Sequence, residues 1–224
     1  MSTLFVVATP IGNLDDLTGR ARFVLSTVPV VLAEDTRRTR ILLQHIGANP
    51  TVISYHQHTV KQKRERLLEY LANGDVALVT DAGTPGISDP GGLFVAEAFA
   101  RFGSTISITP IPGPSAMAAA ASVCGFPMDS FLFLGYPPHK KGRKTFFDRV
   151  ADSKDSVIFY EAPHRILKAL VSLAERCPNR QLVICRELTK QFETIRRGAA
   201  SEILAAAKEE SPRGEYTVVV GPER

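Results

Sequence analysis

Short apolar runs alternate with amphipathic segments along the first half of the chain. The runs are four or five residues long and typical of buried strands; they lie at Leu4–Ala8, Val30–Ala33, Val52–Tyr55, Val76–Thr80 and Thr105–Thr109. Helical spacing of apolar residues predicts helices within Asp16–Val28 and at Thr36–Ile46, Val60–Leu71 and Leu93–Phe102. Strands that alternate with helices in this way favour a parallel sheet with crossover helices.

The second half of the chain has a different rhythm. Strands are predicted at Phe131–Leu134, Val157–Tyr160, Leu182–Cys185, Thr194–Arg196 and Tyr216–Val220. Helices are predicted at Ser115–Val123, Arg143–Val150, Pro163–Ala174 and Ala199–Lys208. Two of these strands follow one another without a helix between them, so the second sheet is predicted to be mixed.

A proline- and glycine-rich stretch, Pro110–Pro114, separates the two halves. The chain has 224 residues, which allows either one large domain or two small ones. The change in the pattern of strands and helices at this stretch favours two domains. We therefore expect an N-terminal α/β domain at residues 1–112 and a C-terminal α/β domain at residues 113–224.

Composition and charge narrow the class of protein. Hydrophobic residues at 44% and charged residues at 22% exclude a disordered chain or a coiled coil, and a net charge of +4 is too small to indicate a nucleic-acid partner. Three cysteines without a CxxC spacing, and an N-terminus without signal-peptide features, favour a cytoplasmic protein. Residues 102–128 carry no charge, but their prolines and glycines favour a buried segment over a membrane span.

The richest candidate for chemistry is the segment Asp81–Gly92, which reads DAGTPGISDPGG. Six of its twelve residues are Gly or Pro, and it follows a predicted buried strand. Parallel sheets bind ligands at the carboxyl ends of their strands, and glycines let the backbone approach a small molecule closely. The alternative is a structural turn, although a turn rarely needs two aspartates and six such residues.

Two further loops share this character. They are Thr9–Leu14, which reads TPIGNL, and Gly113–Ala116, whose serine is also placed to cap the next helix. Neither GxGxxG nor a phosphate-binding GxxxxGK[ST] occurs, which argues against nicotinamide and nucleoside-triphosphate chemistry. No HExxH, Cys/His ligand spacing or GxSxG occurs, so neither a metal nor hydrolase chemistry is expected.

Charged residues follow three predicted strands. Each group contains both a carboxylate and an arginine; the groups are Glu34–Arg38, Glu161–Arg165 and Arg186–Lys190. One such group is usually a surface ion pair or a helix start. Three of them favour a binding role, because arginine can hold a carboxylate or a phosphate through two hydrogen bonds.

Seven motifs in order carry a resemblance to a known family. They are ATPIGNL (Ala8–Leu14), AEDTR (Ala33–Arg37), DAGTPGISDPG (Asp81–Gly91), PGPSA (Pro112–Ala116), FYEAPHR (Phe159–Arg165), RELTK (Arg186–Lys190) and RGE (Arg213–Glu215). Together they resemble the tetrapyrrole methylase-like family, and within it the bacterial methyltransferases I of small-subunit ribosomal RNA. The resemblance spans nearly the whole chain.

The resemblance implies a fold and an activity. It implies two α/β domains with S-adenosylmethionine between them, usually in a homodimer. It also implies 2′-O-methylation of a cytidine ribose in the decoding region of 16S rRNA, within the 30S subunit. The alternatives are a sibling enzyme acting on a tetrapyrrole or a protein, and a non-catalytic module that binds RNA or cofactor.

The same resemblance assigns residues. The cofactor residues are expected to be Thr9, Pro10, Asp81, Ala82, Gly83, Thr84, Ile87, Asp89, Pro90, Ser115, Ala116, Tyr160, Glu161, Gly214 and Glu215. The candidates for orienting or deprotonating the ribose hydroxyl are Asp35, Glu187 and Lys190, and the sequence does not decide among them. The substrate side adds His164, Arg165 and Arg186.

A basic loop, His139–Lys144, is the remaining candidate for RNA contact. Four of its six residues are cationic (Lys140, Lys141, Arg143 and Lys144), and it follows two prolines. We expect it to be exposed and mobile and to bind phosphates together with Arg37, Arg38 and Arg40. Family members often continue into a small helical extension that is thought to touch RNA, and this sequence ends at Arg224, so the loop is expected to take a larger share. The alternative is a solvated charge run.

Overall fold

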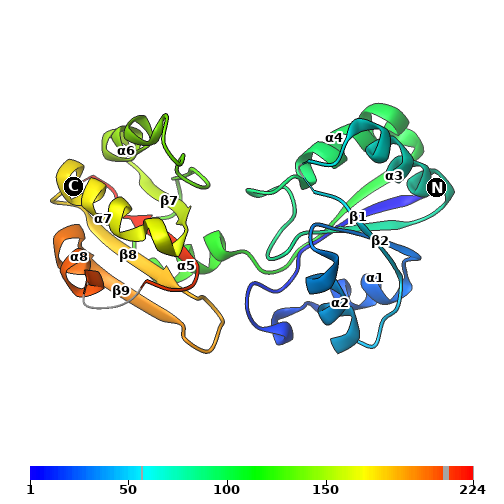
Figure 1. Cartoon of the computed structure of the whole chain (residues 1–224), viewed down its shortest axis with the longest axis horizontal. Helices are drawn as coiled ribbons and strands as arrows, with labels where there is room; N and C mark the ends of the chain where they lie inside the picture. The colour runs from blue at the N-terminus through cyan, green and yellow to red at the C-terminus, as the bar shows by residue number, and fades with distance from the viewer. Residues whose placement is uncertain (57, 209–211, 224) are drawn as a thin grey trace. The chain divides into compact units, whose positions relative to one another are not determined.

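The computed structural model describes residues 1–56, 58–208 and 212–223 (Figure 1). The chain divides into two compact units, Met1–Ser115 and Ala116–Arg224. The boundary expected from the sequence, after residue 112, lies three residues before this division. Each unit has its own sheet and its own hydrophobic core, so each is described by itself.

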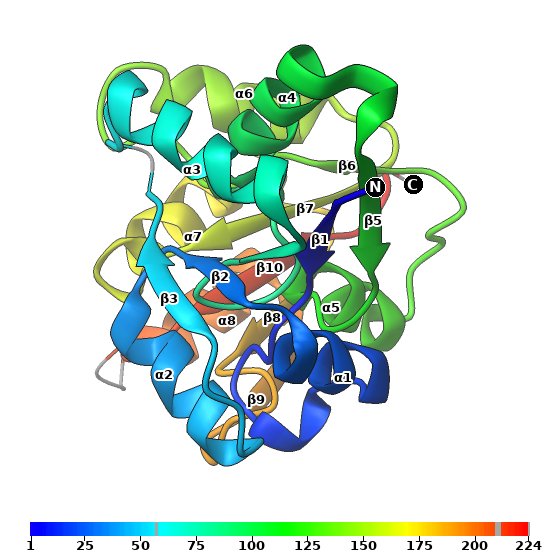
Figure 2. The same cartoon turned by 90° about the vertical axis from the view of Figure 1, so that its right-hand side faces the viewer.

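The first unit contains a five-stranded sheet in the order β3-β2-β4-β1-β5. Its strands are β1 (Thr3–Val7), β2 (Val30–Ala33), β3 (Thr51–Ser54), β4 (Val76–Val79) and β5 (Ser107–Ile111). Every pairing is parallel, which confirms the parallel sheet predicted from the alternation of strands and helices. Figure 2 shows β3 and β5 at the two edges of the sheet.

Four helices cover the two faces of this sheet. They are α1 (Gly19–Thr27), α2 (Thr36–His45), α3 (Lys61–Asn73) and α4 (Gly91–Phe102). Alternate residues of a strand face opposite sides, so Val31 and Ala33 of β2 pack with α1 and α2, whereas Val30 and Leu32 pack with α3 and α4. Figure 1 shows these helix pairs on opposite sides of the sheet.

The second unit contains a five-stranded sheet in the order β6-β7-β10-β8-β9. Its strands are β6 (Phe131–Phe133), β7 (Ser156–Glu161), β8 (Gln181–Arg186), β9 (Thr194–Ala199) and β10 (Tyr216–Val220). The β6–β7 pair is parallel and the other pairs are antiparallel, as the prediction of a mixed sheet requires. The strands that adjoin without a helix, β8 and β9, form a hairpin.

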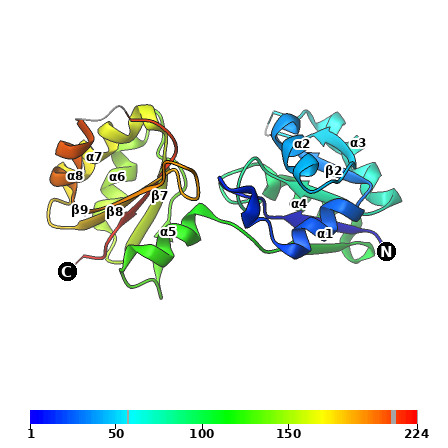
Figure 3. The same ribbon diagram turned by 90° about the horizontal axis from the view of Figure 1, so that it is seen from below.

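Helices cover both faces of the second sheet as well. They are α5 (Ala116–Cys124), α6 (Arg143–Asp152), α7 (Ile166–Arg176) and α8 (Ala200–Lys208). Figure 3 shows α5 on the face opposite to α6, α7 and α8. Pro163 begins a short 3-10 helix, Pro163–Arg165, that leads into α7. In the part of the chain that the structure describes, no helix has both the length and the apolar character needed to cross a bilayer.

One buried cation ties the second unit together. The Arg180 side chain is 6% exposed and donates hydrogen bonds to backbone carbonyls. The acceptors are the oxygens of Gly221 at 2.6 Å, Val150 at 2.7 Å, Asp155 at 2.9 Å and Ser153 at 3.0 Å. The guanidinium thereby links the end of α6 to the chain after β10 without a carboxylate partner among these contacts.

Candidate functional site

Loops that follow β1, β4 and β5 are joined at the carboxyl edge of the first sheet. Thr9 and Gly83 exchange two backbone hydrogen bonds, from Thr9 N to Gly83 O at 2.9 Å and from Gly83 N to Thr9 O at 3.0 Å. The Thr84 hydroxyl donates to Pro114 O at 3.2 Å. Because β1 lies between β4 and β5 in the sheet, the folding of that sheet brings these three loops together.

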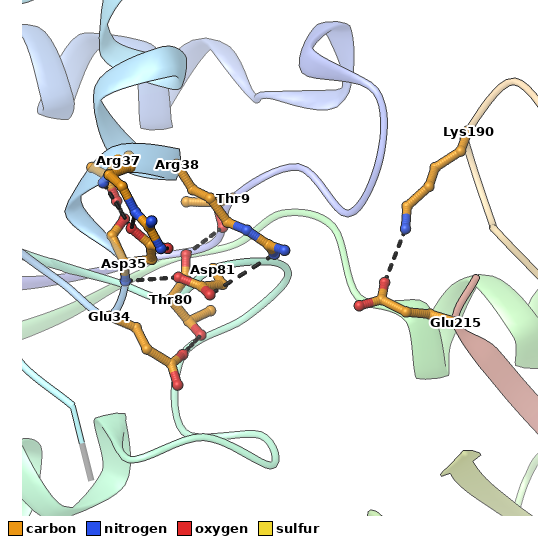
Figure 4. Close-up of polar contacts among 10 residues, drawn as sticks. Thr9, Glu34, Asp35, Arg37, Arg38, Thr80, Asp81, Lys190 and Glu215 are labelled. Atoms are coloured by element: carbon orange, nitrogen blue, oxygen red, sulfur yellow. Dashed lines mark hydrogen bonds and ion pairs between the residues drawn. The ribbon is translucent and has the colours of Figure 1, made fainter. Parts of the chain in front are cut away.

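Most of the predicted cofactor residues of the first unit therefore lie at one edge. Pro10, Ala82 and Ile87 belong to the same loops. The Thr9 hydroxyl donates to Thr80 O at 3.1 Å, which fixes the start of the glycine-rich loop (Figure 4). Ser115 and Ala116 stand on either side of the division between the two units.

The glycine-rich loop, Asp81–Gly92, is held by Asp89. One oxygen of this carboxylate accepts hydrogen bonds from the amides of Gly86 at 2.8 Å and Gly91 at 2.6 Å. The buried Tyr55 hydroxyl donates to Pro90 O at 3.0 Å, and burial raises the pKa of Tyr55 to about 12, so the donor stays neutral. Asp89 thus shapes the loop itself, whereas Ala82 at the start of the loop is exposed.

Carboxylates from β2 and β4 meet beside this loop. Asp81 accepts a hydrogen bond from the amide of Asp35 at 2.8 Å, and Glu34 accepts one from the Thr80 hydroxyl at 3.0 Å (Figure 4). The strands are neighbours in the sheet, so their carboxyl ends lie side by side. Glu34 was predicted from the sequence only as part of the charged group Glu34–Arg38, and Thr80 was not singled out.

Asp35 is engaged by the helix that follows it. Its carboxylate caps α2 by accepting from the Arg37 amide at 2.9 Å, and it also pairs with the Arg37 guanidinium at 2.7 Å. The hydrogen bond from the Arg37 side chain is the main reason that the pKa of Asp35 falls to about 2. A carboxylate with so low a pKa is a weak proton acceptor near neutral pH.

The RELTK and RGE motifs form one cluster in the second unit. One oxygen of Glu187 accepts from the Lys190 ammonium at 2.8 Å and from the Glu215 amide at 2.9 Å. The Lys190 ammonium also pairs with the Glu215 carboxylate at 3.0 Å (Figure 4). Gly214 has a φ of +76°, and a Cβ built there would overlap the Glu187 side chain. Glycine at this position therefore makes room for Glu187.

The protonation states of this cluster follow from its contacts. Desolvation opposes ionisation of Glu187, but the hydrogen bonds from Lys190 and from the Glu215 amide outweigh it and lower its pKa. Desolvation likewise opposes the charge on Lys190, and the hydrogen bonds to Glu187 and Glu215 outweigh it and raise its pKa. At neutral pH Glu187 is therefore a carboxylate and Lys190 an ammonium group.

The FYEAPHR motif places its glutamate in the interior. Glu161 is 1% exposed and pairs with Arg143 at 2.8 Å and with Arg165 at 2.9 Å. The amide of Ala162 donates to the same carboxylate at 2.9 Å. Tyr160, next to it, accepts a hydrogen bond from the amide of Met117 in α5 at 3.2 Å. Glu161 is thus saturated by contacts within the second unit.

The cations predicted to bind RNA differ in how exposed their side chains are and in the partners that these side chains contact. The exposed ones are Arg37, Arg38, Arg40, Lys140, Lys141, Lys144 and His164. Lys144 pairs with Asp148 at 2.9 Å, and Arg38 lies 3.8 Å from Asp81. Arg186 donates to Arg213 O at 2.8 Å. Arg143 and Arg165 are mostly buried by comparison, with side chains 16% and 11% exposed.

This chain combines a parallel sheet, with joined loops at its carboxyl edge, and a second, mixed sheet. The sequence matches the family described as "Tetrapyrrole (Corrin/Porphyrin) Methylases" over residues 3–204, and the chain belongs to that family. The fold agrees: uroporphyrin-III-C-methyltransferase from Thermus thermophilus superimposes with a TM-score of 0.68 at 21% identity, covering 99% of this chain and 94% of that one.

Two curated relatives have higher sequence identity to this chain than the structural neighbour. A protein of Xylella fastidiosa named "Ribosomal RNA small subunit methyltransferase I" is 44% identical, with 97% of this chain and 81% of the relative covered. A protein of the same name from Thermotoga maritima is 39% identical, with 98% of both chains covered. These two proteins are similar to this chain over nearly its whole length.

Proposed function

We propose that this protein transfers a methyl group from S-adenosylmethionine to the 2′-hydroxyl of a cytidine in the decoding region of 16S rRNA. The observation that carries the proposal is the name shared by the relatives at 39–44% identity. The cytidine 2′-hydroxyl and the decoding region are what the resemblance of the ordered motifs implies. The 30S subunit is the proposed context of that RNA.

The carboxyl edge of the first sheet fits the chemistry of the cofactor. S-adenosylmethionine carries a sulfonium and an ammonium group, and the Glu34 and Asp81 carboxylates supply the opposite charge. Gly83, with a φ of +84°, gives the backbone a turn that other residues adopt at a cost, and Ala82 beside it is exposed. We propose Thr9, Asp81, Gly83 and Thr84 as the residues that hold the cofactor, which supplies an electrophilic methyl group.

The reaction makes few demands on acid–base groups. The departing thioether is neutral, so it needs no general acid. The ribose hydroxyl must be aligned with the methyl carbon, and its proton must be accepted. Arg37 contacts both carboxylate oxygens of Asp35, whereas the hydrogen bonds from Lys190 and from the Glu215 amide use one oxygen of Glu187. We propose Glu187 for the orienting or accepting role, with Lys190 fixing the direction of its carboxylate.

A single incubation series tests this function. The protein is incubated with S-adenosylmethionine labelled in the methyl group, and with 30S subunits, free 16S rRNA, a porphyrinogen or ribosomal protein as separate acceptors. We expect label in RNA, and 2′-O-methylcytidine after nuclease digestion. Label in the porphyrinogen or in protein would instead support a sibling enzyme. Absence of label from every acceptor, with cofactor still bound, would support a non-catalytic module.

We also propose that the protein forms a homodimer through the outer face of α4. Large apolar side chains stand in solvent on this helix: Leu93 is 46% exposed and Phe99 is 65% exposed. Ala96 and Ala100 lie exposed at helical spacing between and beside them. The groove toward α3 is lined by both signs of charge, with Lys61 and Arg101 opposite in sign to Glu65 and Glu69. Such a surface can pair with a copy of itself.

A further inference from the structure

Backbone hydrogen bonds hold the basic loop of the second unit, His139–Lys144. The amide of Tyr160 donates to Gly135 O at 2.9 Å, which holds the chain before the loop against β7. The Arg143 amide donates to Lys140 O at 3.2 Å, which closes the loop on itself. The backbone is therefore tied down at both ends, while Lys140 and Lys141 are exposed.

Two arginine side chains reinforce these ties. Arg165 donates from Nη1 to Pro137 O at 3.1 Å, and Arg143 donates from Nη1 to Pro138 O at 3.5 Å. The Arg143 guanidinium also lies over the Phe147 ring, 5.1 Å from its centroid. Both prolines lack an amide donor, so the backbone of each can be held only through its carbonyl.

Glu161 is the residue that holds both arginines in place. Its carboxylate is fully buried and contacts Arg143 through one oxygen and Arg165 through the other. Two guanidinium groups this close repel each other, and burial makes each one costly unless it is paired. With one carboxylate for two cations, the buried group keeps a net positive charge beneath a loop that is itself cationic.

We infer that Glu161 is a positioning residue for RNA binding: it holds Arg143 and Arg165, which fix the loop so that Lys140 and Lys141 face RNA phosphates. The inference rests on the proposed function, because it takes RNA as the substrate. A buried ion group adds little net stability on average, and in some proteins such groups specify a single geometry. A loop that is ordered before binding also avoids the entropy loss of ordering its backbone and long side chains when RNA binds.

The test compares Glu161→Gln with Lys140→Gln/Lys141→Gln in the full-length chain. Glu161→Gln keeps the exposed cations but leaves the two arginines without their carboxylate. We expect its affinity for 16S rRNA to fall about tenfold, since the loop must then be ordered on binding, with the salt dependence retained. The double lysine variant should instead flatten the slope of log affinity against log salt by ~1.4, as the loss of two phosphate contacts requires.

Two further measurements separate positioning from a purely structural role. Trypsin should cleave the native Glu161→Gln protein after Lys140 or Lys141 about tenfold faster than the parent, because the loop opens locally. S-adenosylmethionine affinity should be unchanged in both variants. Lys168→Gln is the matched control, since Lys168 is exposed on α7 and is not among the residues proposed to bind RNA.

Each result decides a different question. Unchanged cleavage and unchanged RNA affinity in Glu161→Gln would overturn the positioning role. Unchanged RNA binding in the double lysine variant would remove the loop from the proposed function and leave Glu161 as a structural residue. If Glu161→Gln fails to fold, Arg143→Gln tests the tie to Pro138 by trypsin cleavage, because it leaves the pair of Glu161 with Arg165 intact; unchanged cleavage would overturn the positioning role.

Discussion

Glu187 holds a backbone conformation that residues other than glycine seldom adopt. Its φ is +53°, and Thr189 two residues later has a φ of +66°. Each such residue costs about 1–3 kcal/mol, so the surrounding contacts must over-determine the loop. Here Lys190 and the Glu215 amide hold the Glu187 carboxylate. The strain is concentrated on the residue that we propose to act on the ribose hydroxyl.

The proposed role of Glu187 predicts a separation of catalysis from cofactor binding. Glu187→Gln keeps the size of the side chain but removes its charge, so it can no longer accept a proton or hold Lys190 as an ion pair. We expect methyl transfer to 30S subunits to fall about 100-fold or more, as for the loss of a general base. Calorimetry should give an unchanged affinity for S-adenosylmethionine. An equal loss of both would place the residue in cofactor binding or in folding.

The ion pair at Asp35 predicts its titration. Its pKa is lowered from 3.8 to about 2, mainly by the hydrogen bond from the Arg37 side chain. Because the folded-state pKa is depressed, the contribution of the ionised carboxylate is fully present above pH 3.8 and is lost as the pH falls through about 2. Carbon-13 NMR of the carboxyl group should show this pKa. In Arg37→Gln the value should rise toward 3.8; a value that stays near 2 would assign the shift to the helix amides.

At the residue scale, the sequence could not show which charged side chains pair with one another in the folded chain. The resemblance placed Glu161 at the cofactor and Arg165 at the RNA, and the charge of the basic loop placed Arg143 at the RNA. The structure instead pairs both arginines with Glu161. Arg143 lies 18 residues before Glu161, on α6, so only the packing of α6 against β7 brings them together. In contrast, the strand ends of β2 and β4 were recognisable as chemistry-bearing from their carboxylates alone.

At the scale of elements, the ends of a strand were predicted best where all of its residues are apolar and buried. β2 was predicted with its observed ends, because all four of its residues are apolar and buried. β5 begins two residues later than predicted, at Ser107, because Gly103–Thr105 forms a short 3-10 helix. The order of the strands was not predictable, since it depends on which side each crossover takes rather than on any local pattern.

The bridge between the first two loops predicts the effect of a substitution in the glycine-rich loop. Gly83 pairs with Thr9 at a φ of +84°, which a β-branched residue adopts only with strain. We expect Gly83→Val to fold and to bind S-adenosylmethionine at least about tenfold more weakly by calorimetry, because the strain of about 1–3 kcal/mol distorts the loop. Gly47→Val is the matched control, with a φ of +72° at the end of α2. Undiminished binding in folded Gly83→Val would exclude this loop as the cofactor site.

The carbonyl cluster around Arg180 predicts a stability effect confined to the second unit. Arg180→Met keeps the length of the side chain but removes every donor, so four carbonyls lose their partner. We expect the free energy of unfolding to fall by about 3 kcal/mol, in line with the loss of a buried charged donor. Denaturant titration measures this, and the exposed Arg149→Met should change it little. Equal losses of unfolding free energy in the two variants would contradict the role of Arg180 in linking α6 to the chain after β10.

At the scale of the whole molecule, each unit is built around its own core. The helices α1 to α4 cover both faces of the first sheet, and α5 to α8 cover both faces of the second. On the outer face of α4, Leu93 and Phe99 stand in solvent with the exposed Ala96 and Ala100 on the same helix. Apolar side chains that remain exposed in this way mark contact surfaces when they are contiguous.

The proposed dimer predicts that one charge on α4 separates the copies. Phe99 is 65% exposed, so glutamate at this position is compatible with folding of the monomer. In a two-fold interface the substitution acts twice, since the same patch is used on both copies and two carboxylates would be desolvated together. We expect sedimentation velocity to show a dimer for the parent and a monomer for Phe99→Glu. Phe23→Glu, on α1 and 69% exposed, is the matched control and should sediment like the parent. A dimer that survives Phe99→Glu would place the interface on another surface.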